Sequence, residues 1–316
     1  MNAPRTRVQR RPVHGVLLLD KPLGLSSNDA LQKAKWLLRA EKAGHTGTLD
    51  PMATGVLPLC FGAATKFSQL HLDADKTYEA VARLGVRTTT GDAEGEVIEE
   101  RDVPRIAPGK LAEVRGRFLG ALQQVPPMYS ALKRDGKALY EYARAGVEVV
   151  REARDVHIHE LNLALATDKD APTLRIVAKV SKGTYIRTLA EDIGEALGCG
   201  ASLIALRRLA TGPFDVAQCV TLEQLEAMSE DARRAALLPV QALLPDHTAV
   251  TLDPENAGRF LSGLRRRGEW PDERTVAVYG HEPRALLGTA HVKAGELIPG
   301  RLLAPTEIQQ ILQSTS

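Results

Sequence analysis

The chain has 316 residues, of which 44% are apolar, and its 41 basic and 39 acidic side chains give a net charge of only +2. Such a length predicts one large domain and a smaller one. The near-neutral charge excludes a globally basic, histone-like nucleic-acid-binding protein. No apolar run approaches the roughly 18 residues of a membrane span. Residues 1–13 form a basic start without the apolar run of a secretory signal. We therefore predict a disordered basic arm and a cytoplasmic protein.

The three cysteines, Cys60, Cys199 and Cys219, are odd in number and far apart in the sequence. This spacing argues against a disulfide framework or a zinc site, because both need paired or clustered thiols. We expect them to be small buried hydrophobic residues.

The first elements are predicted from an apolar run and a helical repeat. Gly15–Leu19 predicts a strand that ends at the turn Asp20–Pro22. Ser26 or Ser27 then caps a helix. Its apolar residues at helical spacing are Ala30, Leu31, Ala34, Leu37 and Leu38.

The next segment, Gly44–Pro51, is a short loop of sequence GHTGTLDP with a single carboxylate. Its glycines permit backbone angles that other residues avoid, and Pro51 pushes Asp50 toward an extended conformation. The carboxylate can therefore stand clear of the main chain. An aspartate in such a turn commonly caps its own backbone, so the residues alone leave a structural and a chemical role open.

Three strands follow. Val56–Leu59 predicts a strand in which Pro58 implies an edge or a bulge. Residues 76–84 alternate with period two and place Tyr78 on the inward face. The segment 174–180 alternates in the same way.

Helical and β-rich regions complete the chain. A helix is predicted after Tyr185, with Gly198 as its stop. Residues 220–240 read as helical, 244–247 as a linker, and 248–316 as a small β-rich appendix. Strands and helices mix without the strand-helix-strand rhythm of a doubly wound sheet. We expect an α+β fold with a mixed, largely antiparallel sheet flanked by helices.

The positive charge is concentrated in local clusters: residues 133–137, 207–208 and 265–267, besides the N-terminal arm. Clusters of this kind often form solvated faces. If several converge on one surface, they provide an electrostatic footprint for a phosphate backbone. Charge alone does not choose between these two interpretations.

Seven separated segments, in order along the chain, resemble one family. They are Gly15–Pro22 with Ser26–Ser27, Gly44–Pro51, Lys76–Tyr78, Thr88-x-Thr90-x-Asp92-x-x-Gly95, Pro126–Lys133, Ser181–Arg187, and Leu206–Arg208 followed by Gly212–Phe214. The chain thereby resembles the bacterial TruB family of tRNA pseudouridine synthases over residues 14–245. Residues 248–316 resemble the family's PUA-like RNA-binding domain.

The resemblance implies a pseudouridine synthase catalytic domain at 14–245, a PUA-like domain at 248–316, and no metal or cofactor. It implies that the chain isomerises uridine-55 in the T loop of tRNA. Asp50 would be the nucleophile, with Arg187 holding its carboxylate ionised and oriented. In the alternative interpretation, Arg187 bridges to Glu191 one helical turn later.

Four further residues are implied at the site. Tyr78 would stack on the target base and help to move a proton, while Tyr185 and Leu206 would line the uracil pocket. His45 would contact the RNA. The target uridine must be flipped out of its loop to reach the nucleophile. Each residue also has an ordinary structural interpretation, in the core or in a turn.

Two hypotheses of other kinds compete with this one. The chain could be an RNA-binding or RNA-folding protein without chemistry, or a synthase that acts on another RNA, as related enzymes do within guide-RNA particles. We favour a self-sufficient monomeric enzyme that binds the T stem-loop of tRNA, with no obligate protein partner and no membrane.

Overall fold

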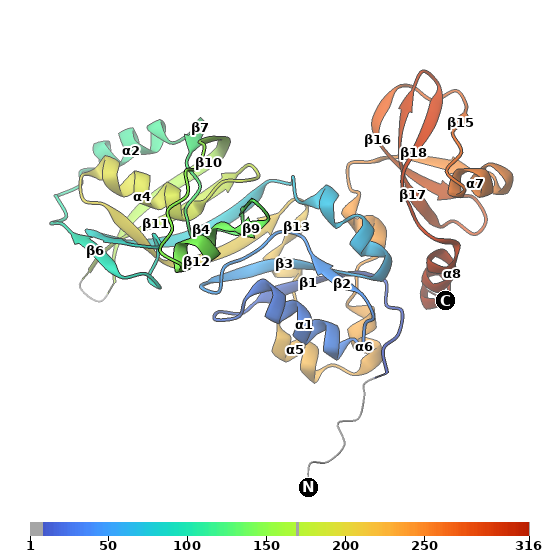
Figure 1. Cartoon of the computed structure of the whole chain (residues 1–316), viewed down its shortest axis with the longest axis horizontal. Coiled ribbons are helices and arrows are strands. Elements are labelled where there is room, and N and C mark those ends of the chain that lie inside the picture. Colours follow the sequence, from blue (N-terminus) through green and yellow to red (C-terminus); the bar gives the residue numbers. More distant parts are fainter. Residues whose placement is uncertain (1–8, 169–170, 316) are drawn as a thin grey trace, which may run out of the picture.

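The computed structural model describes residues 9–168 and 171–315. Two sheets organise the chain, one of nine strands and one of five. Figure 1 shows the large sheet with helices packed on it, and the small sheet as a separate lobe at one end. This arrangement confirms the predicted α+β fold with a small β-rich C-terminal domain.

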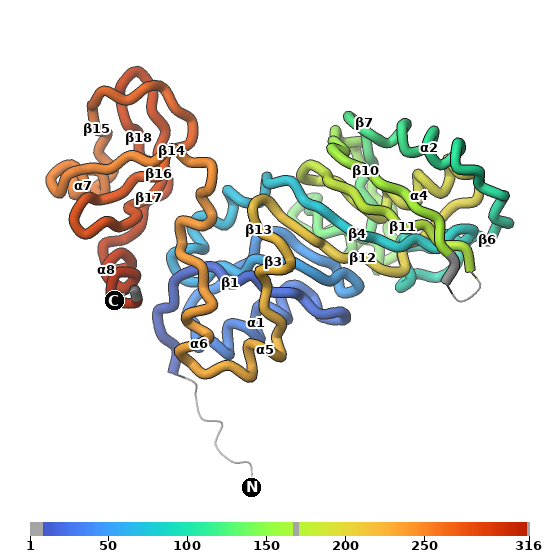
Figure 2. Tube along the Cα trace, turned by 180° about the vertical axis from the view of Figure 1, so that it is seen from behind, coloured from blue at the N-terminus to red at the C-terminus, as the bar shows by residue number. Residues whose placement is uncertain are grey.

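The large sheet has the strand order β1-β3-β12-β4-β11-β10-β7, with β2 paired to β3 and β13 paired to β12. Its strands are β1 (Gly15–Lys21), β2 (Ala43–His45), β3 (Ala53–Phe61), β4 (Lys76–Leu84), β7 (Gly120–Gln124), β10 (Arg154–Asp168), β11 (Ala171–Val180), β12 (Ala201–Thr211) and β13 (Phe214–Asp215). All pairs are antiparallel except β3 with β12. The strand β12 therefore joins the two halves of the sheet, and Figure 2 shows it beside β4 in the middle of the molecule.

Most helices of this part of the chain pack on the large sheet in two groups. The helices are α1 (Ser27–Leu37), α2 (Pro108–Arg117), α3 (Leu139–Arg144), α4 (Ile186–Leu197), α5 (Leu222–Ala227) and α6 (Glu230–Ala235). The helix α4 buries Leu189 and Ile193 against β4 and β11 in one core cluster. A second cluster packs α1 and α5 against β1 and β3. Two short hairpins, β5 (Val86–Thr88) with β6 (Val97–Glu100) and β8 (Lys133–Arg134) with β9 (Lys137–Ala138), project from these layers, and α3 follows the second hairpin.

Several local predictions are confirmed. The first strand is β1, and Ser26 caps α1 by accepting a hydrogen bond of 3.1 Å from the Asp29 amide. The helix α4 ends at Gly198, in the left-handed conformation. Cys60 and Cys199 are buried, whereas Cys219 is only partly so.

The expectation that Pro58 marks an edge strand or a bulge is wrong for the strand as a whole, although Pro58 itself lacks a ladder partner on one side. The strand β3 lies between β1 and β12, and its register with β1 runs without a shift through Pro58. On its other side, β3 pairs with β12 only through Gly55 and with β2 only from Leu59 onward. Proline is tolerated because it falls in the gap between these two partners, where no ladder hydrogen bond is required.

The C-terminal sheet carries helices that the sequence analysis did not expect. Its elements are β14 (Thr248–Leu252), α7 (Pro254–Leu261), β15 (Arg266–Arg267), β16 (Glu273–Gly280), β17 (Leu286–Lys293), β18 (Glu296–Leu302) and α8 (Pro305–Thr315). Ala277 and Leu286 share a core cluster with Val16 of β1. An ion pair of 2.7 Å between Lys66 and Glu307 adds to this attachment.

The end of the predicted basic arm is attached to the domain with the large sheet. Arg10 donates a hydrogen bond of 2.8 Å to the Ala40 carbonyl, and Val13 is buried. The arm therefore does not extend to residue 13, while residues 1–8 lie outside the described part of the chain. Within residues 9–168 and 171–315, no helix has the length and apolar character to cross a membrane.

Candidate active site

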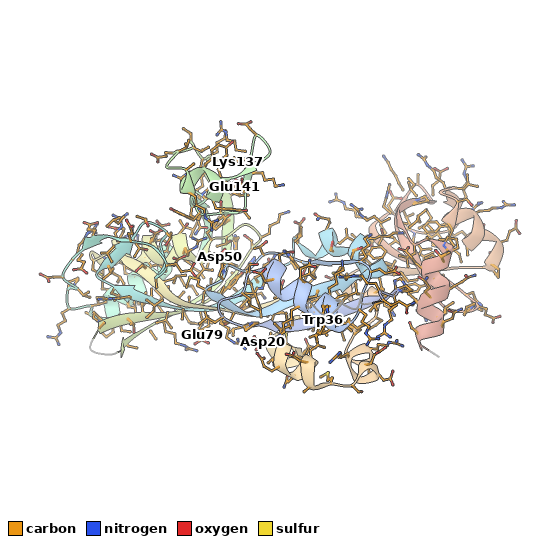
Figure 3. The ribbon with its side chains drawn as sticks, turned by 60° about the horizontal axis from the view of Figure 1, so that its bottom comes forward. Asp20, Trp36, Asp50, Glu79, Lys137 and Glu141 are labelled. Atoms are coloured by element: carbon orange, nitrogen blue, oxygen red, sulfur yellow. The ribbon has the colours of Figure 1, made fainter. Side chains whose placement is uncertain are left out.

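The loop that carries Asp50 lies between β2 and β3 and is anchored from both sides. The Ser27 hydroxyl donates to the Leu49 carbonyl at 2.9 Å and accepts from the Leu49 amide at 2.8 Å. The Ala53 amide donates to the Asp50 carbonyl at 3.0 Å. With its backbone fixed, Asp50 lines a cavity of about 420 Å³. Figure 3 shows Asp50 between the sheet and the segment with Lys137 and Glu141.

Arg187, at the start of α4, contacts the Asp50 carboxylate directly. Its Nη2 lies 2.9 Å from Asp50 Oδ2, and its side chain is only 6% exposed. It also donates to the Tyr129 carbonyl at 2.7 Å and to the Thr90 carbonyl at 3.0 Å. A guanidinium held by several acceptors presents its remaining N–H groups in a fixed direction. The carboxylate of Asp50 is therefore oriented by a buried, preorganised cation.

Asp92 completes this network, and the sequence analysis gave it no role. Its Oδ2 lies 3.4 Å from Arg187 Nη1, and its side chain is 4% exposed. The Thr90 hydroxyl and the Glu94 amide donate to it at 2.5 and 3.1 Å. The carboxylate partners of Arg187 are thus Asp50 and Asp92, and the expected alternative of a bridge to Glu191 is not formed in the described structure. The only sequence signal was the Thr-x-Asp spacing in the segment around residue 90.

Two tyrosines and a leucine form the walls of the cavity. Tyr78 on β4, Tyr185 before α4 and Leu206 on β12 all line it. The backbone of Tyr185 is held by Gln124, whose side chain accepts from the Tyr185 amide at 2.9 Å and donates to its carbonyl at 3.3 Å. Burial raises the pKa of the Tyr185 phenol, so the ring remains neutral. Planar, partly buried rings of this kind can stack on a base.

His45 differs from the other expected residues in its position. It ends β2, is half-buried, and does not line the cavity. Its buried Nδ1 has no hydrogen-bond partner within the described part of the chain. Burial lowers the pKa of this imidazole, which favours the neutral ring. The structure therefore leaves His45 beside the site rather than in it.

A group of buried cations borders the same loop. Lys21 is fully buried and donates to the carbonyls of Pro22 and Leu25 at 2.9 and 2.6 Å. Lys76 lines the cavity, and burial lowers the pKa of both amines to about 8. Arg208 also lines the cavity and is 1% exposed. The sequence analysis quoted these residues in family-like segments but assigned them no function.

The described residues contain no cluster of three or more His, Cys, Asp or Glu side chains with the arrangement of a metal site. The chemistry that these residues themselves offer is that of an oriented carboxylate in a cavity with flat aromatic walls. Such a site can act on one extruded base.

Solved structures match the chain over most of its length. A chain from a crystal structure of a Cbf5–Nop10–Gar1 complex has a TM-score of 0.68 at 25% identity, covering 95% of this chain and 87% of that one. A chain from an H/ACA ribonucleoprotein bound to a substrate RNA containing 2′-deoxyuridine has a TM-score of 0.66 at 23% identity, covering 92% and 86%. The second likeness concerns the fold alone.

Family models match three consecutive segments. Residues 35–186 match the N-terminal domain of TruB family pseudouridylate synthases, and residues 187–245 match the C-terminal domain of tRNA pseudouridylate synthase B. Residues 248–303 match the C-terminal region of pseudouridine synthase II TruB. The fold and these matches are those of a pseudouridine synthase, an isomerase.

Relatives agree over nearly the whole chain. A tRNA pseudouridine synthase B from Verminephrobacter eiseniae (strain EF01-2) is 63% identical over 315 residues, covering 99% of this chain and 95% of the relative. One from Cupriavidus pinatubonensis is 60% identical over 304 residues, covering 94% and 96%. The chain belongs to the TruB family.

Proposed function

We propose that this tRNA pseudouridine synthase isomerises uridine-55 in the T loop of tRNA, with Asp50 as the nucleophile. The observation that carries the proposal is the contact of 2.9 Å between Arg187 and Asp50 at the edge of the 420 Å³ cavity. A carboxylate that is oriented before the substrate arrives needs no reorganisation during the reaction.

The reaction rearranges one nucleoside without any net oxidation. The bond between ribose C1′ and uracil N1 breaks, the base rotates, and C1′ forms a bond with C5. The proton on C5 leaves and N1 takes up a proton, so atoms and electrons balance. Asp50 acts as the nucleophile while the base is detached. Tyr78, which lines the same cavity, assists the proton transfer.

Access to Asp50 requires the uridine to leave its stack. Extrusion costs a few kcal/mol, and stacking on an aromatic side chain returns about 1–3 kcal/mol per base. Tyr78 and Tyr185 provide such surfaces, and Leu206 packs against the same base. His45, at the margin of the site, contacts the RNA that surrounds the extruded nucleotide.

The remaining assignments complete the proposal. The catalytic domain spans 14–245 and the PUA-like domain 248–316, which contacts the tRNA beyond its T stem-loop. The enzyme acts as a monomer in the cytoplasm and needs no obligate protein partner. Because base extrusion opens the tRNA elbow, a tRNA-folding role that does not need Asp50 accompanies the chemistry.

The test is tritium release from C5-labelled uridine in an unmodified tRNA transcript. We expect Asp50→Asn to lower the rate on the order of 10³-fold or more, with tRNA affinity within about threefold of the parent because no binding contact is lost. Asp155→Asn, at an exposed carboxylate on β10, is the control and keeps full activity. Replacing the T-loop uridine should abolish release. Parent-like release by Asp50→Asn would refute the nucleophile, and release that is independent of that uridine would refute the position.

A further inference from the structure

Arg208 is the largest fully buried side chain of the described residues, and the proposed reaction gives it no role. It lies on β12, opposite Gly55 of the parallel strand β3. Gly55 has φ +102°, and a Cβ there would stand 2.1 Å from the Arg208 carbonyl oxygen. Only glycine therefore lets β3 approach β12 so closely. This approach brings the Arg208 side chain against the strand that directly follows the Asp50 loop.

The guanidinium of Arg208 is hydrogen-bonded to that strand and lies close to the loop. Its Nε donates to the Val56 carbonyl at 2.7 Å. Its Nη1 lies 3.6 Å from the point where a Cβ on Gly47 would stand, which is an ordinary packing distance. Gly47 is three residues before Asp50. One planar group is thus bonded to the strand and leaves the loop little free space beside Gly47.

The charge of Arg208 is not neutralised by a nearby carboxylate. Within residues 9–168 and 171–315 no Asp or Glu oxygen lies within ion-pair distance of it, and its buried Nη2 has no hydrogen-bond partner. The pKa values of four basic neighbours are lowered, chiefly by burial and to a smaller extent by the charge of Arg208. These neighbours are Lys21, His45, His71 and Lys76. The negative charge of Asp50 acts in the opposite direction on Lys21.

The adjacent arginine provides an internal comparison. Arg207 forms a two-bond pair with Asp20, at 3.0 and 2.6 Å. Neighbouring residues of a strand point to opposite faces, and Figure 3 shows Asp20 and Asp50 on different sides of the sheet. Arg207 is therefore neutralised at the surface, whereas Arg208 points toward the catalytic loop. A buried cation without a carboxylate partner lowers the stability of the fold, so we expect Arg208 to contribute to the function of the site instead.

We propose that Arg208 is a positioning residue for the reaction: it supports the loop that carries Asp50 and adds a second buried positive charge to the cavity that the carboxylate lines. Arg187 holds the carboxylate from the side of α4, and Arg208 acts from the side of β12 without touching the substrate. The proposal rests on the nucleophilic role of Asp50 proposed above. It predicts an effect on the chemical step and on its pH dependence, with little effect on RNA affinity.

The experiment compares Arg208→Gln, Arg208→Lys and Arg207→Gln in the full chain. Tritium release is measured in single turnover with saturating unmodified tRNA from pH 5 to 8, and tRNA affinity is measured separately. We expect Arg208→Gln to slow release at least tenfold with affinity within twofold. Its acid limb should move to higher pH, because a carboxylate ionises less readily when a nearby positive charge is lost.

The other two variants separate charge from structure. Arg208→Lys keeps the charge without the planar brace, so its acid limb should match that of the parent while its rate is intermediate. Arg207→Gln should stay within twofold of the parent throughout. If Arg208→Gln does not fold, as judged by circular dichroism and thermal unfolding, the lysine variant alone decides by its rate and acid limb.

Several outcomes would overturn the proposal. They are a parent-like rate and acid limb in Arg208→Gln, a slower rate with an unmoved acid limb, and a loss confined to tRNA affinity, which would indicate an RNA contact instead. A parent-like rate or a shifted acid limb in Arg208→Lys would also contradict it. Asp50→Asn serves as the reference: activity in that variant would refute the proposed nucleophile, whereas its inactivity beside an unaffected Arg208→Gln would refute only the present inference.

Discussion

Two arginines that line one cavity, one from α4 and one from β12, are both buried, but their hydrogen-bonding groups are satisfied in different ways. Arg187 is surrounded by acceptors: two carboxylates and two backbone carbonyls. Arg208 has one backbone carbonyl and several protonatable neighbours. The first arrangement is a closed hydrogen-bonded network, and the second is a concentration of positive charge. Burial of an arginine therefore does not by itself indicate whether its charge is neutralised.

We expect the largest effect on stability from a substitution of Arg187. Arg187→Leu would leave the buried Asp92 carboxylate without its cation, and breaking a buried pair costs about 3–5 kcal/mol. We expect a loss of this size in the free energy of unfolding, measured by urea denaturation, together with loss of tritium release. The control is Arg175→Leu, whose ion pair with Glu79 is open to solvent and should contribute far less to stability than the buried pair. Equal losses in the two variants would contradict the closed network.

The opposite side of the cavity can be disturbed through Gly55. Gly55→Ala would place a Cβ 2.1 Å from the Arg208 carbonyl oxygen, at a φ of +102°. We expect it to lower the free energy of unfolding by about 2 kcal/mol or more, and to slow release further if Arg208 moves. Gly116→Ala is the control, because its Cβ meets nothing within 4 Å and it lies in α2. That substitution should be neutral or stabilising by up to about 1 kcal/mol. A neutral Gly55→Ala would show that β3 and β12 can separate.

The smallest expected effect is the pH dependence contributed by Lys21. Its pKa is lowered, chiefly by burial, from 10.5 to about 8. Between these values the unfolded chain holds a proton that the folded chain has released, so the contribution of Lys21 to stability rises with pH across this window. Between pH 7.5 and pH 9.5, the rise is at most about 2 kcal/mol.

Lys21→Met should remove that rise. Urea denaturation at pH 7.5 and pH 9.5 gives the change in free energy of unfolding for parent and variant, and the difference isolates the lysine. Loss of its two hydrogen bonds shifts both values equally. If the free energy of unfolding changes by the same amount in the parent and the variant between the two pH values, protonation of Lys21 does not destabilise the folded protein.

Much of this architecture could be predicted from the sequence, and the failures have physical causes. The alternation in β4 and β11 and the capped helix α1 are local patterns. The strand β12 was not predicted as a strand, because its two register shifts, between Leu203 and Ala205 and between Arg208 and Ala210, break the alternation. The helix α7 has a clear signal, an Asp253 cap followed by proline, but it is only eight residues long.

The candidate site likewise combines features with a local sequence pattern and features that depend on the tertiary fold. The unusual loop around Asp50 is visible in the sequence, and the ordered series of family-like segments suggested Arg187 and the tyrosines. The pairing of Asp92 with Arg187 joins residues 95 positions apart and has no local pattern. The placement of Arg208 under the loop likewise depends on β3 and β12 meeting in parallel. Contacts that are set by the sheet order can be inferred only once that order is known.

The central position of β12 has a consequence for biosynthesis. Until the ribosome has released residues 201–211, the growing chain contains β1–β3 and the β4–β11–β10–β7 group as two sheets without the strand that joins them. The loop with Asp50 and the wall with Tyr78 are made early but belong to different halves. Insertion of a strand that pairs with partners over 100 residues earlier is a slow, non-local step. The nascent enzyme therefore acquires its cavity late, when two preassembled halves close on a strand that begins only at residue 201.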